Sequence, residues 1–214
     1  MYQPPLHRED RLDAQHQLIT AHPFGLLISA GRGGLLANAV PFTLDAAASA
    51  KGTLRTHVAR ANPHWQEFTG DGCDCLVVFQ GPQSYVTPSW YPTKGQTGKV
   101  VPTWNYVTVQ ARGRAAVHED APWLRAQIEQ LTREREAHRA VPWQVSDAPA
   151  EFTAQLMRAI VGIEIPIASI EGKWKVSQNR PEADRLGVHA GLTAEGAMNS
   201  AMAALVAERG GLKL

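Results

Sequence analysis

Alternating hydrophobic and polar positions mark the first two thirds of the chain as β-structure. Residues 24–29 (FGLLIS) and 35–44 lie on either side of the glycine-rich stretch 31–34. A glycine-rich link between two such runs predicts a β-hairpin. Further strands are predicted at residues 52–58, 75–79, 103–117 and 161–170.

Helical spacing interrupts this pattern in four places. Asn62 followed by Pro63 is typical of a helix start and predicts a short helix to about Phe68. Asp120 precedes an apolar stripe and predicts the start of a longer helix. Further helices are predicted from the stripe of Phe152, Leu156 and Ile160 and from the alanine-rich residues 193–209.

Strands separated by turns and flanked by helices predict a β-rich α+β fold, built as a barrel or a sandwich. Pro166 cannot donate a hydrogen bond within a ladder, so its strand is expected to bend, to bulge or to lie at an edge there. No repeat or long linker divides the chain. We therefore expect one domain over residues 1–214, with about 190–214 as a C-terminal helical extension.

Composition narrows the function classes. Apolar residues make up 44% and charged residues 19% of the chain, and the net charge is +1. This balance is that of a globular protein without the global basic field that drives nucleic-acid binding. No apolar run is long enough for a membrane span, and the start lacks a secretory signal, so a cytoplasmic protein is expected. Cys73 and Cys75 are expected to be packing thiols, and no metal site is predicted.

The stretch THVARANPHW places His57, Arg60 and Asn62 where a strand leads into a helix. A helix start offers free N–H groups, and an arginine adds a forked donor, so this set suits a phosphate. In the alternative interpretation Asn62 only caps the helix and Arg60 is a solvated surface residue.

The stretch from Gly81 to Tyr106 places aromatic rings and hydrogen-bonding side chains among turn formers. Flat apolar walls with donors at their edges suit a planar heteroaromatic ligand. In the alternative interpretation these residues only pack the loop, with prolines fixing the turn and tryptophans filling holes. The candidate residues are Ser84, Tyr85, Ser89, Trp90, Thr103, Trp104 and Asn105.

The stretch EGKWKVSQNR places Lys173 and Lys175 on one face of a strand, with Trp174 on the other. A second anion-binding set is predicted here, although a polar strand end before a helix gives the same pattern. The chain lacks the G-x-S-x-G, H-E-x-x-H and P-loop motifs. The candidate residues are Lys175, Gln178, Asn179 and Arg180.

These stretches also carry a family resemblance. The strings MYQPP, HVARANPHW, VFQGPQSYVTPSWY, VPTWNY, VGIEI and EGKWKVSQNR occur in that order and cover most of residues 1–188. In this the chain resembles the PaiB family of FMN-binding negative transcriptional regulators. The resemblance implies an FMN-binding split β-barrel with peripheral helices, usually a homodimer that binds FMN in a groove made by both subunits.

The same resemblance implies roles for the candidate residues. Arg60 is the expected phosphate ligand, supported by His57 and Asn62. The segments around Ser84–Tyr91 and Thr103–Tyr106 are expected to line the isoalloxazine ring, and Lys175–Arg180 to reach the flavin of the other subunit.

Three functions follow as alternatives. The first is an FMN-binding regulator of the PaiB type, acting through flavin or a protein partner rather than by direct operator binding. The second is a flavin-dependent oxidoreductase, so the enzymatic status stays open and no catalytic residue is assigned. The third is a binding module without flavin.

Overall fold

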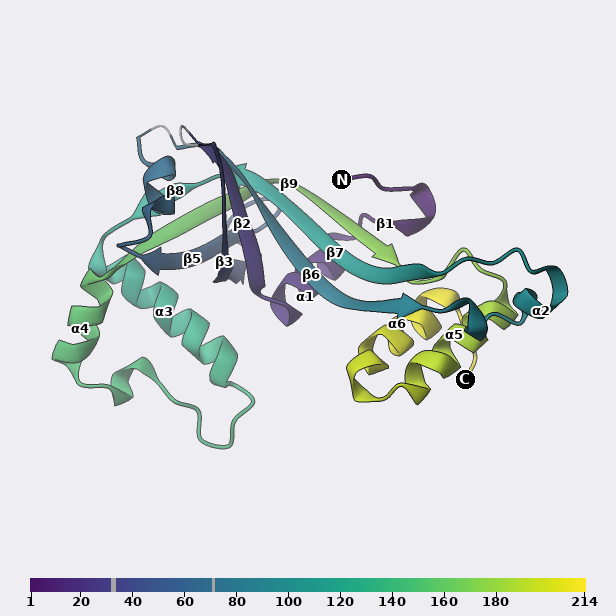
Figure 1. The fold of residues 1–214 in the computed structure, drawn as a ribbon. Coiled ribbons are helices and arrows are strands. Elements are labelled where there is room, and N and C mark those ends of the chain that lie inside the picture. The colour runs from purple at the N-terminus through teal and green to yellow at the C-terminus, as the bar shows by residue number, and fades with distance from the viewer. Residues whose placement is uncertain (32–33, 71) are drawn as a thin grey trace. The chain divides into compact units, whose positions relative to one another are not determined.

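The structure is a computed structural model that describes residues 1–31, 34–70 and 72–214 (Figure 1). The strands are β1 (Arg8–Glu9), β2 (Phe24–Gly31), β3 (Gly34–Pro41), β4 (Thr43–Asp45), β5 (Thr53–Ala59), β6 (Asp74–Val86), β7 (Thr103–Arg114), β8 (Ala116–His118) and β9 (Ile160–Lys175). The α-helices are α1 (Leu12–Ala21), α2 (Thr93–Thr97), α3 (Ala121–Glu136), α4 (Ala150–Arg158), α5 (Glu182–Ala194) and α6 (Ser200–Gly210). Short 3-10 helices are η1 (Pro5–His7), η2 (Pro63–Phe68), η3 (Pro88–Trp90), η4 (Val145–Asp147) and η5 (Ala197–Asn199).

The strands of the described residues form one sheet in the order β3-β2-β6-β7-β9-β5-β4, and β1 and β8 also pair with β9. Strands β2 and β3 form the predicted hairpin, in register from Phe24↔Pro41 to Gly31↔Gly34. The other two residues of the predicted turn, at positions 32 and 33, lie outside the described residues. The neighbouring strands pair antiparallel wherever the register is known.

The chain forms two compact units by its internal contacts. Unit 1 comprises residues 1–15, 80–109 and 171–214, and unit 2 comprises residues 16–79 and 110–170. Strands β6, β7 and β9 contribute residues to both. The expectation of a single domain stays a prediction.

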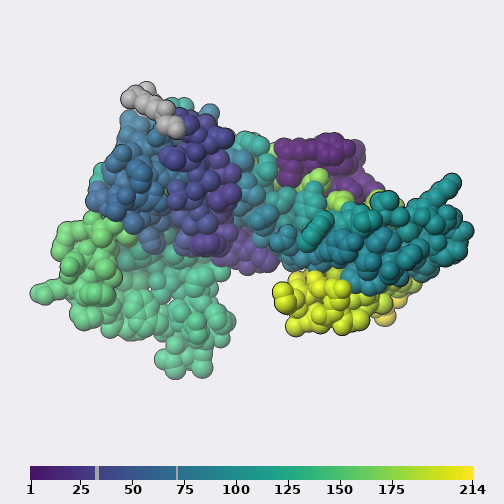
Figure 2. Space-filling model, in the orientation of Figure 1, coloured from purple at the N-terminus to yellow at the C-terminus, as the bar shows by residue number. Residues whose placement is uncertain are grey.

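Unit 2 is built on the pairing of β5 with β9, from Thr53↔Pro166 to Ala59↔Ile160. Alternate residues of both strands, such as Leu54 and Ile163, are fully buried, as a half-buried sheet requires. Helix α3 begins where predicted, because the Asp120 side chain accepts a hydrogen bond from the Trp123 N–H at 2.9 Å. The residues of α3 and α4 form the green lower part of this unit (Figure 2).

Unit 1 joins the N-terminal arm to the last residues of β9 and to two helices. Strand β1 pairs with β9 at Arg8↔Lys173 and Glu9↔Gly172. Helices α5 and α6 lie side by side (Figure 1) and bury Val188 and Met202 among other apolar side chains. The C-terminal part of the chain therefore forms a pair of packed helices, α5 and α6, rather than an isolated terminal helix.

Several predicted elements differ from the observed ones. Strand β6 continues to Val86, so Ser84 and Tyr85 lie on a strand and not in a loop. Ile160 begins β9 instead of ending a helix. The single helix predicted at 193–209 is wrong, because α5 ends at Ala194 and α6 begins at Ser200. The edge position predicted as one option for Pro166 is also wrong, because β9 lies between β7 and β5.

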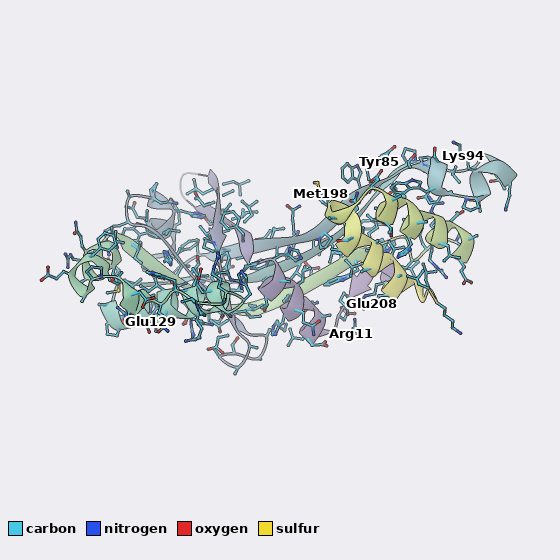
Figure 3. All side chains as sticks on the ribbon, turned by 90° about the horizontal axis from the view of Figure 1, so that it is seen from below. Arg11, Tyr85, Lys94, Glu129, Met198 and Glu208 are labelled. Carbon is cyan, nitrogen blue, oxygen red and sulfur yellow. The ribbon has the colours of Figure 1, made fainter. Side chains whose placement is uncertain are left out.

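Glu9 anchors unit 1. Its side chain is 4% exposed and accepts hydrogen bonds from the Arg11 guanidinium at 2.8 and 3.0 Å. A second arginine, Arg209 of α6, pairs with the same carboxylate at 2.6 Å, and Arg11 lies near Glu208 (Figure 3). The hydrogen bonds from Arg11, reinforced by Arg209, lower the pKa of Glu9 to about 2 from 4.5.

The Glu9→Gln substitution is expected to reduce the free energy of unfolding at pH 7 by about 2–4 kcal/mol, because it removes a buried carboxylate charge that pairs with both Arg11 and Arg209. The contribution of Glu9 is fully present above its unfolded-state pKa of 4.5 and is lost as the pH falls toward about 2. Urea unfolding at pH 7 and in steps down to pH 3 measures this, and the difference between the two proteins should become smaller at each step toward the acid end. Asp10→Asn is the control, because the ion pair that Asp10 forms with Arg8 is exposed. Equal losses in both variants would contradict this role of Glu9.

Candidate functional site

Two lysines on one face of β9 form the main cationic feature of unit 1. Lys173 is only 7% exposed, and its Nζ lies 5.3 Å from the ring centroids of both Tyr2 and Tyr106. Lys175 Nζ donates hydrogen bonds to Thr103 Oγ1 and, at 2.7 Å, to the Trp104 carbonyl. Neither lysine forms an ion pair within the residues that the structure describes. Both charges are therefore held by rings and neutral oxygens, which leaves them able to attract an anion.

Neighbouring cations strengthen this field. Burial, followed by the charges of Lys173 and Arg180, lowers the pKa of Lys175. The Arg180 guanidinium lies over the Tyr91 ring at 4.6 Å from its centroid. Burial also lowers the pKa of His7, whose buried Nδ1 has no hydrogen-bond partner among the described residues. A bound anion would reduce the mutual repulsion of these groups.

An exposed aromatic pair borders the lysine face. The rings of Tyr85 and Trp104 meet edge to face, with centroids 5.9 Å apart. Their residues are 47% and 55% exposed, and Tyr85 is labelled in Figure 3. They come from β6 and β7, and Trp104 directly follows the lysine-bound Thr103. Exposed ring faces beside a cation suit a planar anionic ligand.

Trp90 has a packing role. An added Cβ at Gly191 of α5 would lie 2.3 Å from the Trp90 ring, and one at Gly187 would lie 1.9 Å from the Trp90 carbonyl oxygen. Only glycine permits so close an approach of η3 to α5. For Trp90 the structure therefore supports the packing alternative of the sequence analysis.

Three other predicted residues are engaged in polar contacts within unit 1. The buried side chains of Asn105 and Ser177 exchange hydrogen bonds at 2.9 and 3.1 Å. Ser177 also has a positive backbone φ of 65°, which is unusual for a residue other than glycine. Gln178 accepts from the Val176 N–H at 2.7 Å and donates to backbone carbonyls. Ser84 donates to the Asn199 side chain at 2.5 Å. These contacts shape the turn after β9 and attach η5 to β6, while Ser89 and Asn179 are exposed.

The predicted phosphate set lies in unit 2. Arg60 donates to the carbonyls of Arg158 at 3.0 Å and Ile160 at 3.3 Å, and its guanidinium also pairs with Glu119. Asn62 caps η2 by accepting from the His64 N–H at 3.0 Å, as predicted.

The third member of this set, His57, bonds through Nδ1 to Gln127 Oε1 at 2.7 Å. The candidate residues thus form two sets, each described within its own unit, and the assignment of their roles stays a prediction.

Sequence reasoning missed the N-terminal contribution to the lysine face. Alternation alone indicates Lys173, because it shares a face with Lys175. Tyr2 and His7 have no such signal, because they reach this face only through the pairing of β1 with β9.

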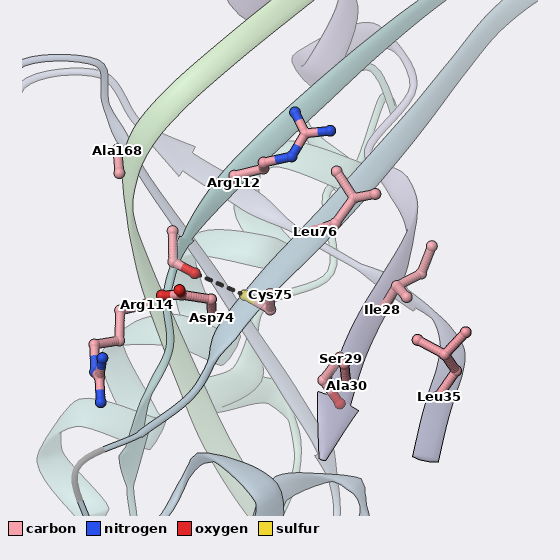
Figure 4. A pocket seen from close by; sticks show the side chains of 11 residues that line it. Ile28, Ser29, Ala30, Leu35, Asp74, Cys75, Leu76, Arg112, Arg114 and Ala168 are labelled. Atoms are coloured by element: carbon pink, nitrogen blue, oxygen red, sulfur yellow. Dashed lines mark hydrogen bonds between the residues drawn. The ribbon is translucent and has the colours of Figure 1, made fainter. Parts of the chain in front are cut away.

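A cavity of about 470 Å³ in unit 2 was also missed (Figure 4). Arg112 and Arg114 line it, and the Cys75 thiol donates to the Gly113 carbonyl at 3.3 Å. Burial raises the pKa of the Cys75 thiol to about 12, so this cysteine is the predicted packing thiol and not a nucleophile. Alternation of Arg112 and Arg114 along β7 is the signal that could have indicated this cavity.

A β-rich fold with a cationic and aromatic face defines a class of protein that binds planar anionic cofactors. The chain belongs to the family described as "Putative FMN-binding domain", which it matches over residues 1–169. It is 36% identical to an uncharacterized protein of Emericella nidulans, over 100% of this chain and 99% of the relative. It is 29% identical to the protease synthase and sporulation protein PAI 2 of Bacillus subtilis, over 88% of this chain and 87% of the relative. The resemblance to the PaiB family is confirmed.

Solved structures support the fold. The FAD and heme binding protein from Mycobacterium smegmatis superposes with a TM-score of 0.58 at 14% identity, covering 79% of this chain and 73% of that one. The predicted class, a β-rich α+β split barrel of the flavin-binding type with peripheral helices, is therefore confirmed, and FMN is the cofactor of the family. None of the helices in the described ranges is long and apolar enough to cross a membrane.

The residues of unit 1 fit FMN by their chemistry. FMN combines a phosphate, which is a dianion near neutral pH, with a flat ring bearing hydrogen-bonding edges. Lys173, Lys175 and Arg180 supply positive charge, and Trp104 and Tyr85 supply accessible ring surface. The unpartnered Nδ1 of His7 adds a buried polar atom beside the same lysines. No carboxylate is ion-paired with Lys173 or Lys175 in the described parts of the chain, so an anion would not have to displace one.

Replacing the two tryptophans separates their roles. Trp90→Ala is expected to lower the free energy of unfolding by about 2–4 kcal/mol, because it opens a void against α5. Trp104→Ala is expected to change it by less than about 0.5 kcal/mol, because the side chain is exposed, but to weaken FMN binding. Urea unfolding and FMN titration of both variants measure this. A Trp90 variant of unchanged stability that no longer binds FMN would show that Trp90 is a ligand wall instead.

Proposed function

We propose that this chain is a homodimeric FMN-binding protein of the PaiB type. It acts as a negative transcriptional regulator through its flavin and a protein partner, and not by reading an operator itself. The observation that carries the flavin assignment is the lysine face of β9, where Lys173 and Lys175 lie against tyrosine rings and neutral oxygens. Family membership supports FMN as the ligand of this face.

Each group of this face has a proposed task. Lys173 and Lys175 attract the anionic cofactor, and Thr103 with the Trp104 carbonyl holds the Lys175 ammonium in place. Trp104 and Tyr85 offer a wall for the isoalloxazine. When bound, FMN supplies reversible one- and two-electron chemistry, while these residues control its orientation and its contact with water.

Arg60 is retained as a second proposed phosphate ligand. Its Nε and Nη2 hydrogen bonds to backbone carbonyls fix the guanidinium plane. The pair with Glu119 is the exchangeable contact, because the two side chains are 40% and 53% exposed. Exposed ion pairs contribute little to stability, so a phosphate could replace Glu119 at small cost.

The outer face of the β3-β2-β6 part of unit 2 supports the proposed homodimer. Phe24 is 66% exposed, Leu26 39% and Leu35 80%. The register aligns Leu26 with Ala39 on one side and Val78 on the other, so these side chains form a continuous apolar surface. A contiguous apolar surface of this kind suits a self-complementary contact with a second copy.

The regulatory part of the proposal has its own support. The Bacillus subtilis relative is named for protease synthesis and sporulation. The net charge of +1 gives little of the electrostatic attraction on which DNA binding depends. A partner that distinguishes flavin-bound from flavin-free protein is therefore favoured over direct operator contact. A salt-dependent gel shift by the purified protein alone at nanomolar concentration would contradict this part.

A flavin-dependent oxidoreductase is the second candidate. The exposure of Tyr85 and Trp104 favours it, because a reductant ring could stack where these side chains remain accessible. Anaerobic addition of NADPH to the FMN-loaded protein tests it, and bleaching of the flavin band at a catalytic rate would support it.

The flavin assignment predicts a retained visible absorption band after FMN loading and desalting, which denaturation releases as FMN. Lys175→Met and Arg60→Ala should each weaken FMN by roughly 1.5–3 kcal/mol, the range of a charged hydrogen bond. Titration monitored by flavin fluorescence gives both affinities. Lys213→Met is the matched control, because Lys213 is exposed near the C-terminus, and its affinity should equal that of the wild type.

The two variants are independent tests. If Arg60→Ala alone keeps full affinity, Arg60 is removed from the site and the lysine face stands. If the wild type retains no flavin even at high FMN, the flavin proposal fails and the fold assignment remains.

A further inference from the structure

A second cavity in unit 2, of about 480 Å³, is lined by residues of α3, η4, α4 and β5. Its described lining contains no aspartate, glutamate, lysine or arginine. Three large side chains at this site remain unusually exposed, namely Trp143 at 48%, Phe152 at 53% and Leu156 at 52%. The size is within the usual range for sites that enclose a small molecule.

One polar side chain in the lining, His57, offers a hydrogen-bonding atom to a bound molecule. His57 lines the cavity, and its Nδ1 lies 2.7 Å from the Gln127 amide oxygen. An amide oxygen only accepts, so with Gln127 in this orientation His57 Nδ1 is the donor, and Nε2 is the acceptor of the ring in that tautomer. His57 Nε2 has no hydrogen-bond partner among the described residues.

The partner of His57 is itself incompletely satisfied. Gln127 is 2% exposed, and its Nε2 has no hydrogen-bond partner in the described residues. Buried amide groups are usually fully bonded, and an unbonded one has a cost that a ligand or water can remove. Gln127 thus lies behind the lining and orients His57, which is the member of the pair that faces the cavity.

We propose that this cavity binds a small, uncharged, mainly apolar molecule whose single hydrogen-bond donor reaches His57 Nε2, as a phenol-like or indole-like ring would. The absence of charged lining side chains excludes FMN, because its phosphate would lose hydration without gaining a cation. Trp143 and Phe152 supply ring surface for an aromatic guest. In this assignment His57 recognises the guest and not the flavin phosphate, so the site is independent of the proposed flavin function.

The test uses indole and 1-methylindole as probes, because 1-methylindole carries a methyl group in place of the N–H donor. Ligand-observed NMR titration of the full-length protein is expected to show saturable indole binding, about tenfold tighter than 1-methylindole, the effect of one hydrogen bond. In His57→Phe the two probes should bind equally, because the ring shape is kept and the acceptor is lost.

A cavity-filling variant completes the design. Ala148 lines the cavity, so Ala148→Phe should abolish the binding of both probes, whereas Ala140→Phe, at an exposed position outside the lining, should leave it unchanged. The two variants should unfold at wild-type urea concentrations within about 0.5 M, which confirms that they are folded.

Indole that fails to saturate, or that binds Ala148→Phe as well as the wild type, would overturn the proposal. A concentration-dependent dimer that Phe152→Asp dissociates, in protein that binds no indole, would assign the exposed rim to a second copy and overturn it as well.

Discussion

The register of β1 on β9 is the constraint on which unit 1 depends. Side chains alternate along a strand, so a slip by one residue would place Trp174 where the lysines now lie. The pairing of Arg8 with Lys173 and of Glu9 with Gly172 fixes this register. Position 172 must be glycine, because an added Cβ would lie 2.9 Å from the Glu9 carbonyl oxygen and 2.7 Å from the Trp174 ring. On the opposite side of the strand, the ion pairs of Glu9 with Arg11 and Arg209 stabilise this arrangement.

The same register places the buried Lys173 side chain against tyrosine rings, which accounts for its burial. Lys173 lies beside two tyrosine rings, each of which contributes roughly 0.5–2 kcal/mol of cation–π attraction. Burial, and after it the positive charge of Lys173, lowers the pKa of Lys175. A fold that keeps two like charges together holds electrostatic energy that a bound anion releases. By linkage, the same anion raises the pKa of Lys175, so binding and protonation support one another.

The local features of this chain were predictable because their causes are local. The caps at Asn62 and Asp120, the β2–β3 hairpin and the shared face of Lys173 and Lys175 follow from neighbouring residues alone. The continuation of β6 through Gly81 and Pro82 was not predictable in this way, because these residue types are typical of turns. Here they lie within a strand of the sheet.

Contacts over long sequence separations account for the remaining differences at the candidate site. The role of Trp90 depends on Gly191, one hundred and one positions further along the chain by the numbering. The contribution of Tyr2 to the lysine face depends on a strand pairing across most of the chain. Residue type therefore identified groups able to bind a ligand, whereas the packing of η3 and β1 decided which of them remain available.

In the two proposals, the lysine face and the α3–α4 cavity (the cavity that His57 lines) would select opposite ligands for the same physical reason. A charged molecule entering the uncharged cavity would lose hydration with only His57 and threonine hydroxyls in return. A neutral ring at the lysine face would gain stacking on Trp104 but would leave Lys173 and Lys175 repelling one another. Charge separates the two specificities more sharply than shape does, because one uncompensated charge outweighs the contacts of several apolar atoms. Each ligand is thus restricted to its own site, and occupancy of one need not compete with occupancy of the other.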